Sequence, residues 1–292
     1  MPTIKDVAHT AGCSTATVSR ALANPEKVTE KTRHRVAQAI AKVGYSPNVA
    51  ARNLRRSESR TILILLPDIS NPFFSQIING LEEVAQRAGY QVLVGDCDHD
   101  ASRTQAYFDL LPTNQADGII LLTSEVPLSL VKPLHQSSAF PVVVACEYFE
   151  GISLPTIFID NHQAAARATE YLISLGHQHI ATISGPMGNP ICKDRIRGFR
   201  DELQRSGLSA NPEWFVEGDF TFRTGYQQAK RLLSNASSRR PTAIFCHSDE
   251  MAIGALKAAS ELNISVPSDL SVVGFDNIDF SEYCEPELTT IS

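Results

Sequence analysis

The sequence predicts a small all-α domain at the N-terminus, followed by an α/β body with two lobes. The net charge is divided unevenly: residues 1–60 hold 11 Lys and Arg against four Asp and Glu, whereas the remaining residues hold 15 against 28. The pattern of apolar residues also changes near Thr61, from helical spacing to short continuous runs. A basic head on an acidic body favours a nucleic-acid-binding module joined to a second domain, with a merely solvated basic face as the alternative.

The composition excludes several classes of protein. With 292 residues, of which 43% are hydrophobic and 20% charged, the chain is long enough for two modest domains and too apolar to be disordered. It has no apolar run of about 18 residues, and its first residues lack the apolar core of a secretory signal. The six cysteines are widely spaced without a Cys-x-x-Cys pair, so we expect reduced thiols in a cytoplasmic protein.

The N-terminal domain, which we place at residues 1–48, is expected to contain three short helices over residues 4–11, 14–23 and 30–43. Thr3 and Asp6 have the spacing of a capping box before the first helix. Gly12 supplies a tight turn, Ser14 is a good N-cap for the second helix, and Gly44 ends the third.

The first two helices and the glycine turn between them have the pattern of a helix-turn-helix. The expected inner side of the second helix consists of Val18, flanked by Ala16, Thr17, Ala21 and Leu22. Its outer hydroxyl side chains can reach base edges in the major groove, and Arg20 can pair with guanine. The alternative is a three-helix bundle whose Ser and Thr are only solvated. The positive charge and the place of Arg20 favour DNA binding.

Five short stretches of the N-terminal part match a known family. They are TIKDVA at 3–8, AGCSTATVSRAL at 11–22, VTEKTR at 28–33, GYSPN at 44–48 and AARNL at 50–54. These stretches resemble the LacI family of bacterial transcription repressors, which implies a dimeric, sequence-specific DNA-binding protein regulated by a small effector. By this resemblance the residues that contact bases or phosphates are Thr3, Ser14, Thr15, Ala16, Thr17, Ser19, Arg20, Thr29, Thr32, Tyr45 and Asn48. Thr15 and Ala16 match the two positions that most distinguish one operator from another.

Residues 49–60 are expected to form a linker. Four arginines surround Leu54 in a segment that is too short and too charged to fold unaided, so ordering on DNA in a dimer is expected. The family resemblance implies a hinge helix here, in which Leu54 is the wedge that enters the minor groove and kinks the duplex. Without the resemblance, Leu54 is a lone apolar residue in a linker.

From Thr61 onward, short apolar runs alternate with amphipathic stretches. Continuous apolar runs indicate strands covered on both faces, and their alternation with helices is typical of α/β folds with mainly parallel sheets. The expected strands are residues 62–66, 92–94, 119–122, 142–145, 156–159, 180–183, 243–246 and 271–274; the expected helices include residues 73–88, 164–175, 195–205 and 251–261. The unit occurs twice, with a crossing near residues 154–160, so residues 61–292 are expected to form two lobes.

Polar residues gather at the carboxyl ends of these strands, where open parallel sheets bind ligands. They are Asp68, Asp96, Ser124, Glu147, Asp160, Ser184, Asp249, Asp276 and Asn277. Such groups suit sugar hydroxyls, and Phe73, Phe74 and Phe220 can stack on a ring. The alternative is that the acids cap the following helices, and Asp249 fits either role equally.

The body also resembles the LacI family, whose fold there is like that of periplasmic binding proteins. The matching stretches are residues 67–74, 177–186, 195–199, 249–255 and 273–277. The resemblance implies an effector pocket between the lobes, with matching positions at Phe74, Arg195, Phe220 and Asp276, and plausible additions at Phe73 and Glu147. A salt-bridge role is the alternative for Arg195.

Six further stretches resemble the cytidine-responsive repressors of the family. They are residues 57–63, 94–97, 189–195, 218–222, 245–249 and 275–279. This resemblance implies a nucleoside effector, whose ring stacks on phenylalanine and whose ribose hydroxyls contact Asp276 and Arg195. Purine-responsive relatives share several of these residues, so a purine or a sugar is the alternative effector. The resemblance also implies cooperation with the cyclic AMP receptor protein on DNA.

Two other classes of function fit the sequence less well. A solute-binding protein of a transport system has the same body but needs an export signal and no basic head. An enzyme is disfavoured because the sequence has no HExxH, GxSxG, P-loop or GxGxxG motif, so no catalytic residue, metal site or cofactor is expected. The family normally continues beyond Ser292, so we expect the C-terminal end to be truncated, without part of the last lobe and of the dimer surface.

Overall fold

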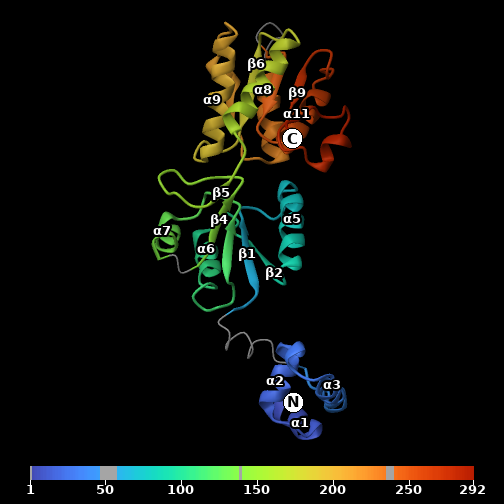
Figure 1. Cartoon of the computed structure of the whole chain (residues 1–292). Coiled ribbons are helices and arrows are strands. Elements are labelled where there is room, and N and C mark those ends of the chain that lie inside the picture. Colours follow the sequence, from blue (N-terminus) through green and yellow to red (C-terminus); the bar gives the residue numbers. More distant parts are fainter. Residues whose placement is uncertain (1, 47–57, 138–139, 235–239) are drawn as a thin grey trace. The chain divides into compact units, whose positions relative to one another are not determined.

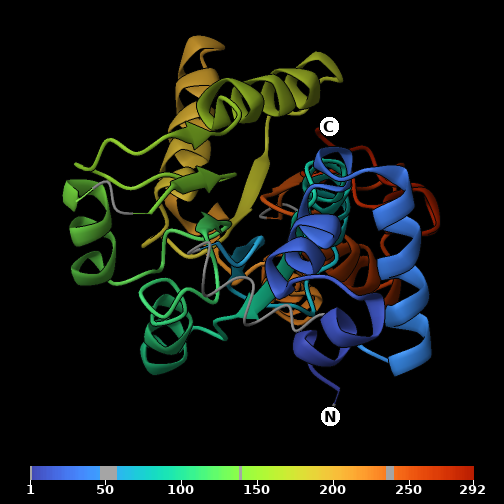
Figure 2. The same ribbon diagram turned by 60° about the horizontal axis from the view of Figure 1, so that its bottom comes forward.

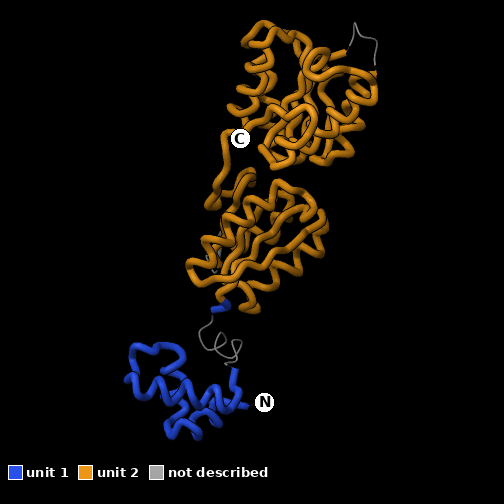
Figure 3. The backbone as a smooth tube through the Cα atoms, turned by 90° about the vertical axis from the view of Figure 1, so that its right-hand side faces the viewer, with its two compact units in different colours: residues 1–59 blue, residues 60–292 orange. Residues whose placement is uncertain are grey.

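The computed structural model describes residues 2–46, 58–137, 140–234 and 240–292. The chain divides into two compact units, residues 1–59 and residues 60–292, which Figure 3 shows in separate colours. Within the described ranges, every helix is too short or too polar to cross a lipid bilayer.

The first unit contains three α-helices within residues 2–46 (Figure 1). They are α1 (Ile4–Ala11), α2 (Thr15–Ala23) and α3 (Glu30–Val43), with the short 3-10 helix η1 (Pro25–Lys27) between the last two. Their shared core consists of Val7, Ala8, Ala11, Val18, Val36 and Ala39. The predicted helices are therefore confirmed, because apolar residues three and four apart meet along each inner face.

Local signals fix the ends of α1 and α2. The backbone N–H of Thr3 donates to the Asp6 carboxylate at 2.8 Å, which lowers the pKa of Asp6. Gly12 adopts φ +60° and ends α1, in a left-handed conformation that other residues adopt at a cost. The hydroxyl of Ser14 then caps α2 by accepting from the N–H of Thr17 at 3.1 Å.

The predicted inner side of α2 is wrong for Ala16 and Leu22. Val18 is fully buried and Ala21 packs beside it, but Ala16 is exposed. Two residues of α-helix turn through about 200°, so Ala16 lies on the side opposite Val18. Leu22 lies in the last turn, where its side chain is 38% exposed.

The second unit begins with a five-stranded parallel sheet in the order β2-β1-β3-β4-β5. Its strands are β1 (Thr61–Leu66), β2 (Gln91–Asp96), β3 (Gly118–Leu121), β4 (Val142–Ala145) and β5 (Thr156–Ile157). Figure 1 shows α5 (Phe73–Arg87) on one face, and α6 (Ala101–Phe108) and α7 (Leu128–Ser137) on the other. Ile64 and Leu66 pack towards α5, whereas Leu63 and Leu65 pack towards the other two helices. Burial on both faces accounts for the continuous apolar sequence of β1.

A four-stranded parallel sheet in the order β7-β6-β8-β9 forms the second lobe. Its strands are β6 (Ile180–Ser184), β7 (Phe215–Glu217), β8 (Ala243–Cys246) and β9 (Ser271–Val273). The covering helices are α8 (Asn161–Ser174) and α9 (Pro190–Arg205) on one face, and α10 (Phe222–Leu233) and α11 (Asp249–Glu261) on the other. Gly225 and Gly254 let α10 and α11 touch through their backbones, since a Cβ at either position would lie about 2.2 Å from a neighbouring carbonyl oxygen.

The two-lobed α/β architecture and all eight expected strands are confirmed, with differences at the ends of elements. The three-residue strand β7 lies at the end of the short apolar run WFV at 214–216 and was not predicted. Helix α9 begins at Pro190 rather than at Arg195, because the Asn189 side chain caps it and Pro190 suits the first helical position. The crossing between lobes follows β5, which ends at Ile157.

Hydrogen bonds join the two lobes near the carboxyl ends of both sheets. The Asn189 amide donates to Glu147 at 2.7 Å, and the Tyr148 hydroxyl donates to Asp194 at 2.8 Å. On another side, the Gln76 amide donates to Asp279 at 2.8 Å. The strand ends of both lobes therefore lie against each other, which positions their polar residues as one group.

Candidate functional site

The outer surface of α1 and α2 carries the predicted DNA-contacting residues of the second helix. Figure 2 shows the helices of the first unit in blue. Thr15, Ala16 and Arg20 are exposed, and Ser19 is half-buried. A shallow hollow of about 560 Å³ follows this surface, lined by Ile4, Lys5, Thr15, Ala16, Ser19, Arg20, Ala23 and Asn24. Two cationic side chains beside small polar ones suit a phosphate backbone with base edges next to it.

Several predicted contact residues also act within the domain as caps. The hydroxyl oxygens of Ser14 and Thr17 lie 2.9 Å apart, and the Thr3 hydroxyl donates to Asp6 at 2.8 Å. Thr29 and Thr32 form a similar pair at 3.0 Å at the start of α3. Each hydroxyl has one donor and two acceptor positions, so a cap leaves capacity for a second partner.

Of the remaining predicted DNA-contacting residues, the structure describes only Tyr45. Tyr45 is half-buried and packs against the three-helix core. Asn48 and Leu54 lie outside the described residues, as does most of the expected hinge over residues 49–60.

Arg195 is the most constrained of the predicted effector residues. It lies on α9 and is 5% exposed. Its Nε donates to Oδ1 of Asn161 at 2.8 Å, and Nη1 donates to the carbonyl of His247 at 2.5 Å. The guanidinium also lies 3.5 Å from the ring centre of Phe275, and Nη2 lies 3.9 Å from the Asp276 carboxylate. The structure therefore holds one buried cation in a fixed orientation.

Asp276 reaches Arg195 from a strained loop after β9. Its φ is +106° and that of Asn277 is +53°, a pair of conformations that cost energy in residues with a side chain. Burial raises the pKa of Asp276 well above its ordinary value, although the charge of Arg195 opposes the shift. Strain of this kind is retained where the surrounding structure requires one side-chain position.

Glu147 joins the two lobes rather than standing free at a strand end. It is 8% exposed, and its carboxylate accepts from the N–H of Ser124 and from the amide of Asn189. Burial raises the pKa of Glu147, and both hydrogen bonds oppose the shift. Because Asn189 also caps α9, the helix that carries Arg195, this contact connects the first lobe to the Arg195 helix.

The three predicted aromatic residues lie in different environments. Phe74 is 7% exposed and belongs to the core of the first lobe. Phe73 is half-buried, with its ring centre 5.2 Å from that of Phe74. Phe220 adopts φ +66°, and its ring packs against the backbone of Gly185, where a Cβ would lie 2.1 Å from the ring. Phe73 and Phe220 therefore keep a partly accessible ring, while Phe74 mainly supports Phe73.

The other strand-end acids have structural partners. Asp160 caps α8 by accepting from the N–H of Gln163 at 2.9 Å. Asp249 neither caps its helix nor stands free: it accepts from the N–H of Ile278 at 2.9 Å and from the Thr290 hydroxyl at 2.5 Å. Asp249 therefore holds the segment after β9 against α11.

Four buried polar residues around Arg195 were not predicted from the sequence. They are Asn161, Asn189, His247 and Glu250. Asn161 and Asn189 have hydrogen-bond partners in the protein, but the side chains of His247 and Glu250 have none among the described residues. The signal for the last two was the polar run HSDE directly after β8, of which only Asp249 was predicted as a strand-end residue of the ligand site.

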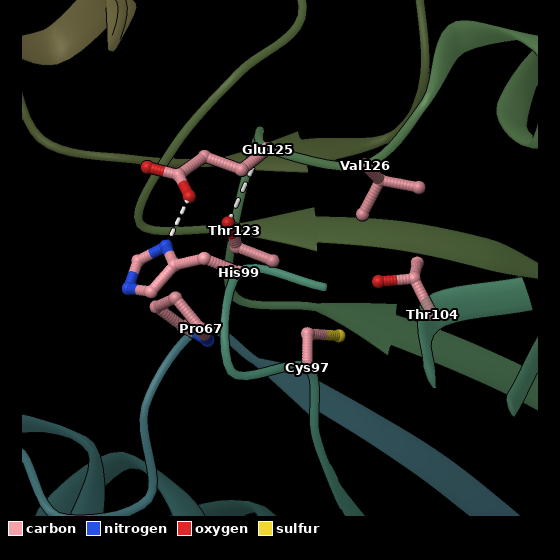
Figure 4. Close-up of a pocket in the computed structure, with 7 residues that line it drawn as sticks. All are labelled: Pro67, Cys97, His99, Thr104, Thr123, Glu125 and Val126. Atoms are coloured by element: carbon pink, nitrogen blue, oxygen red, sulfur yellow. Dashed lines mark hydrogen bonds and ion pairs between the residues drawn. The ribbon is translucent and has the colours of Figure 1, made fainter. Parts of the chain in front are cut away.

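A separate small cavity lies in the first lobe (Figure 4). It is lined by Pro67, Cys97, His99, Thr104, Thr123, Glu125 and Val126. Nδ1 of His99 lies 2.5 Å from the Glu125 carboxylate, which raises the pKa of His99. The cavity measures about 10 Å³, about the space of one water molecule, so an effector does not fit there.

Both units match family models. Residues 3–48 match the family described as bacterial regulatory proteins, lacI family. Residues 59–292 match the family described as periplasmic binding proteins and sugar binding domain of LacI family. Together the two matches cover the chain apart from residues 1–2 and 49–58.

Curated relatives and solved structures agree with these matches. The HTH-type transcriptional repressor CytR of Escherichia coli K12 is 47% identical over 99% of this chain and 84% of its own length. The repressor PurR of Aliivibrio fischeri MJ11 is 35% identical, covering 100% of this chain and 86% of the relative. 

Among solved structures, the lac repressor dimer bound to operator and the anti-inducer ONPF is similar at a TM-score of 0.86 and 28% identity, covering 99% of this chain and 86% of that one. The transcriptional regulator CelR in complex with cellobiose has a TM-score of 0.71 at 27% identity, covering 99% of this chain and 87% of that one. The relatives are transcriptional repressors, not enzymes. This chain belongs to the LacI family and is a helix-turn-helix transcriptional repressor with an effector-binding domain.

Proposed function

We propose that the chain works as a homodimer that represses transcription from a roughly palindromic operator and responds to a nucleoside such as cytidine. The observation that carries the effector half is the buried Arg195 beside Asp276, with the half-buried rings of Phe73 and Phe220 at the strand ends of the two lobes. The observation that carries the DNA half is the exposed, cationic outer surface of α2.

On DNA, α2 enters the major groove. Thr15, Ala16 and Arg20 contact base edges, while the hydroxyls around the helix ends contact phosphates and set the orientation. Leu54 enters the minor groove from the hinge, and Asn48 precedes it. The similarity over 99% of the chain to a lac repressor dimer bound to operator supports both the DNA contact and the two-fold arrangement.

In the body, the effector lies at the carboxyl ends of the two sheets. The base stacks on Phe73 and Phe220, and the ribose hydroxyls hydrogen-bond with Asp276 and Arg195. Phe74 supports the stacking ring, and Glu147 links the effector's surroundings to the second lobe. The structure of CelR with cellobiose supports a small hydroxyl-rich ligand in a relative of this fold. The resemblance of six stretches to cytidine-responsive repressors favours a nucleoside over a sugar.

The functional division follows the sequence: residues 1–48 bind DNA, residues 49–60 form the hinge, and residues 61–292 bind effector and form the dimer. Effector binding changes the relative position of the two lobes, and this change alters how the hinge is ordered. The affinity for the operator changes as a result, so a coupling free energy links the effector site to the DNA-binding site. Cooperation with the cyclic AMP receptor protein on DNA belongs to the same proposal and rests on the sequence resemblance alone.

A DNA mobility titration of the purified chain tests this proposal. Promoter fragments are titrated at low ionic strength, alone and with cytidine, adenosine or ribose. We expect binding in the nanomolar range to one class of fragment, with a midpoint that cytidine shifts and ribose does not. A shift with adenosine or ribose alone replaces the nucleoside assignment by a purine or a sugar. Failure to bind any fragment contradicts the repressor proposal and favours a solute-binding role.

A further inference from the structure

The turn between β8 and α11 buries two ionisable side chains without partners. His247 is fully buried, and neither ring nitrogen has a hydrogen-bond partner among the described residues. Glu250 is 2% exposed, and neither carboxylate oxygen accepts a hydrogen bond of good geometry there. Such groups cost free energy when they are buried unsatisfied, and they are rare in folded proteins.

Both side chains lie beside the buried pair formed by Arg195 and Asp276. The carbonyl of His247 accepts from Arg195, and the charge of Arg195 adds to burial in lowering the pKa of His247. Glu250 lies close enough to Asp276 to raise the pKa of that carboxyl further. The two unpartnered side chains are therefore part of the same polar group at the end of β8.

Neighbouring side chains already perform the main structural roles at this turn. Ser248 caps α11 by accepting from the N–H of Met251, and Asp249 holds the segment after β9. The ring of His247 packs on that of Phe245 at 5.3 Å between centres, a contact that an apolar side chain also makes. An apolar residue at either position would avoid the cost of burial, which points to a partner that comes from outside the chain.

We propose that His247 and Glu250 are specificity-determining residues that hydrogen-bond an uncharged, hydroxyl- or amine-bearing part of the effector. The inference rests on the proposed effector site and extends it to the turn after β8. A neutral imidazole offers one donor and one acceptor, and the carboxyl of Glu250 accepts from hydroxyl or amine groups. Burying a phosphate dianion in this polar group costs free energy that the single guanidinium does not offset, because Asn161 and the His247 carbonyl already accept from Arg195. The site therefore takes a nucleoside and rejects the nucleotide.

Calorimetric titration of the full chain tests this inference, with cytidine and cytidine monophosphate as probes. The variants are Glu250→Met and His247→Leu, which remove hydrogen-bonding capacity at similar volume. Glu261→Gln, at the exposed end of the same helix, is the matched control. We expect each variant to weaken cytidine binding at least tenfold, the control to bind as the parent does, and the nucleotide to bind at least tenfold more weakly than the nucleoside.

Thermal melting without ligand separates this role from a structural one. We expect the melting temperatures of Glu250→Met and His247→Leu to equal or exceed that of the parent, because each substitution removes buried polar atoms that have no hydrogen bond of good geometry among the described residues. Lower melting temperatures with unchanged cytidine binding overturn the inference and leave the proposed function intact. Equal binding of nucleoside and nucleotide also overturns it. A parent chain that binds neither cytidine, adenosine nor ribose overturns the proposed effector and this inference together.

Discussion

The guanidinium of Arg195 and the carboxylate of Asp276 lie 3.9 Å apart, with both side chains largely shielded from solvent. This separation is longer than a hydrogen bond, so the pair attracts by charge while Asp276 keeps its capacity to accept from another donor. Asn161, the His247 carbonyl and the Phe275 ring occupy the other sides of Arg195. A ligand hydroxyl that donates to Asp276 completes this arrangement.

The first prediction concerns Asp276→Ala. The substitution removes the acceptor for the effector but lies in the second unit, whereas the DNA-contacting residues lie in the first. We expect cytidine binding to weaken by about 2–4 kcal/mol, as for loss of a charged hydrogen-bonding partner, while operator affinity without effector changes little. Calorimetry and mobility titration measure the two quantities separately. Unchanged cytidine binding would remove Asp276 from the site.

The second prediction concerns Arg20→Ala on the exposed face of α2. Loss of a bidentate contact with guanine weakens binding to the cognate operator by about 1–3 kcal/mol, with a much smaller effect on random DNA. Arg35→Ala on exposed α3 is the matched control, since it removes the same charge from a different surface. Fluorescence anisotropy with both DNAs gives the two losses. Equal losses on cognate and random DNA would assign Arg20 to a phosphate.

The elements that could be predicted from the sequence are those with local causes. Gly12, Ser14 and Gly44 mark the ends of the first helices through turn geometry and capping within a few residues, and each acts as predicted. The buried strands were recognisable because covering on both faces demands continuous apolar runs. Strand β7 was missed because it has three residues, of which one is the exposed Glu217.

The candidate site was predictable only in part, because its contacts depend on how distant elements meet. Glu147 was chosen as a strand-end acid, but its partner Asn189 is 42 residues away on the other lobe. His247 and Glu250 were missed because their burial depends on the packing of the turn after β8 against α9 and the segment that follows β9. No periodic pattern in the sequence predicts contacts between elements that are so far apart along the chain.

The third prediction concerns the link between the lobes. Asn189→Ala removes the amide that donates to buried Glu147 and the cap of α9, so one carboxylate oxygen loses its partner. We expect the free energy of unfolding to fall by about 2–3 kcal/mol, the combined size of a lost cap and an unsatisfied buried acceptor. Denaturant titration measures this value. The double variant Asn189→Ala with Glu147→Gln should lose less than the sum of the two single variants, because a neutral amide costs less to bury.

The last prediction concerns pH. Burial raises the pKa of Glu250 to about 7 from its ordinary value of 4.5, with Asp249 adding to the shift and the Ser248 hydroxyl opposing it. The folded chain therefore holds the Glu250 proton more tightly than the unfolded chain does. Stability from this group is complete below about pH 4.5 and is lost as the pH rises through 7.

Glu250→Gln removes this titration while keeping the shape of the side chain. The variant should be more stable than the parent by about 1 kcal/mol near pH 5 and by about 3 kcal/mol at pH 8, as follows from a pKa of 4.5 in the unfolded chain and about 7 in the folded one. The charged groups that act on Glu250 or respond to it, Asp249 and Asp276, are present in both proteins, so their own titrations largely cancel in the difference. Urea titrations at pH 5, 6.5 and 8 measure it. A difference that stays constant with pH would mean that Glu250 is already ionised and solvated in the folded chain.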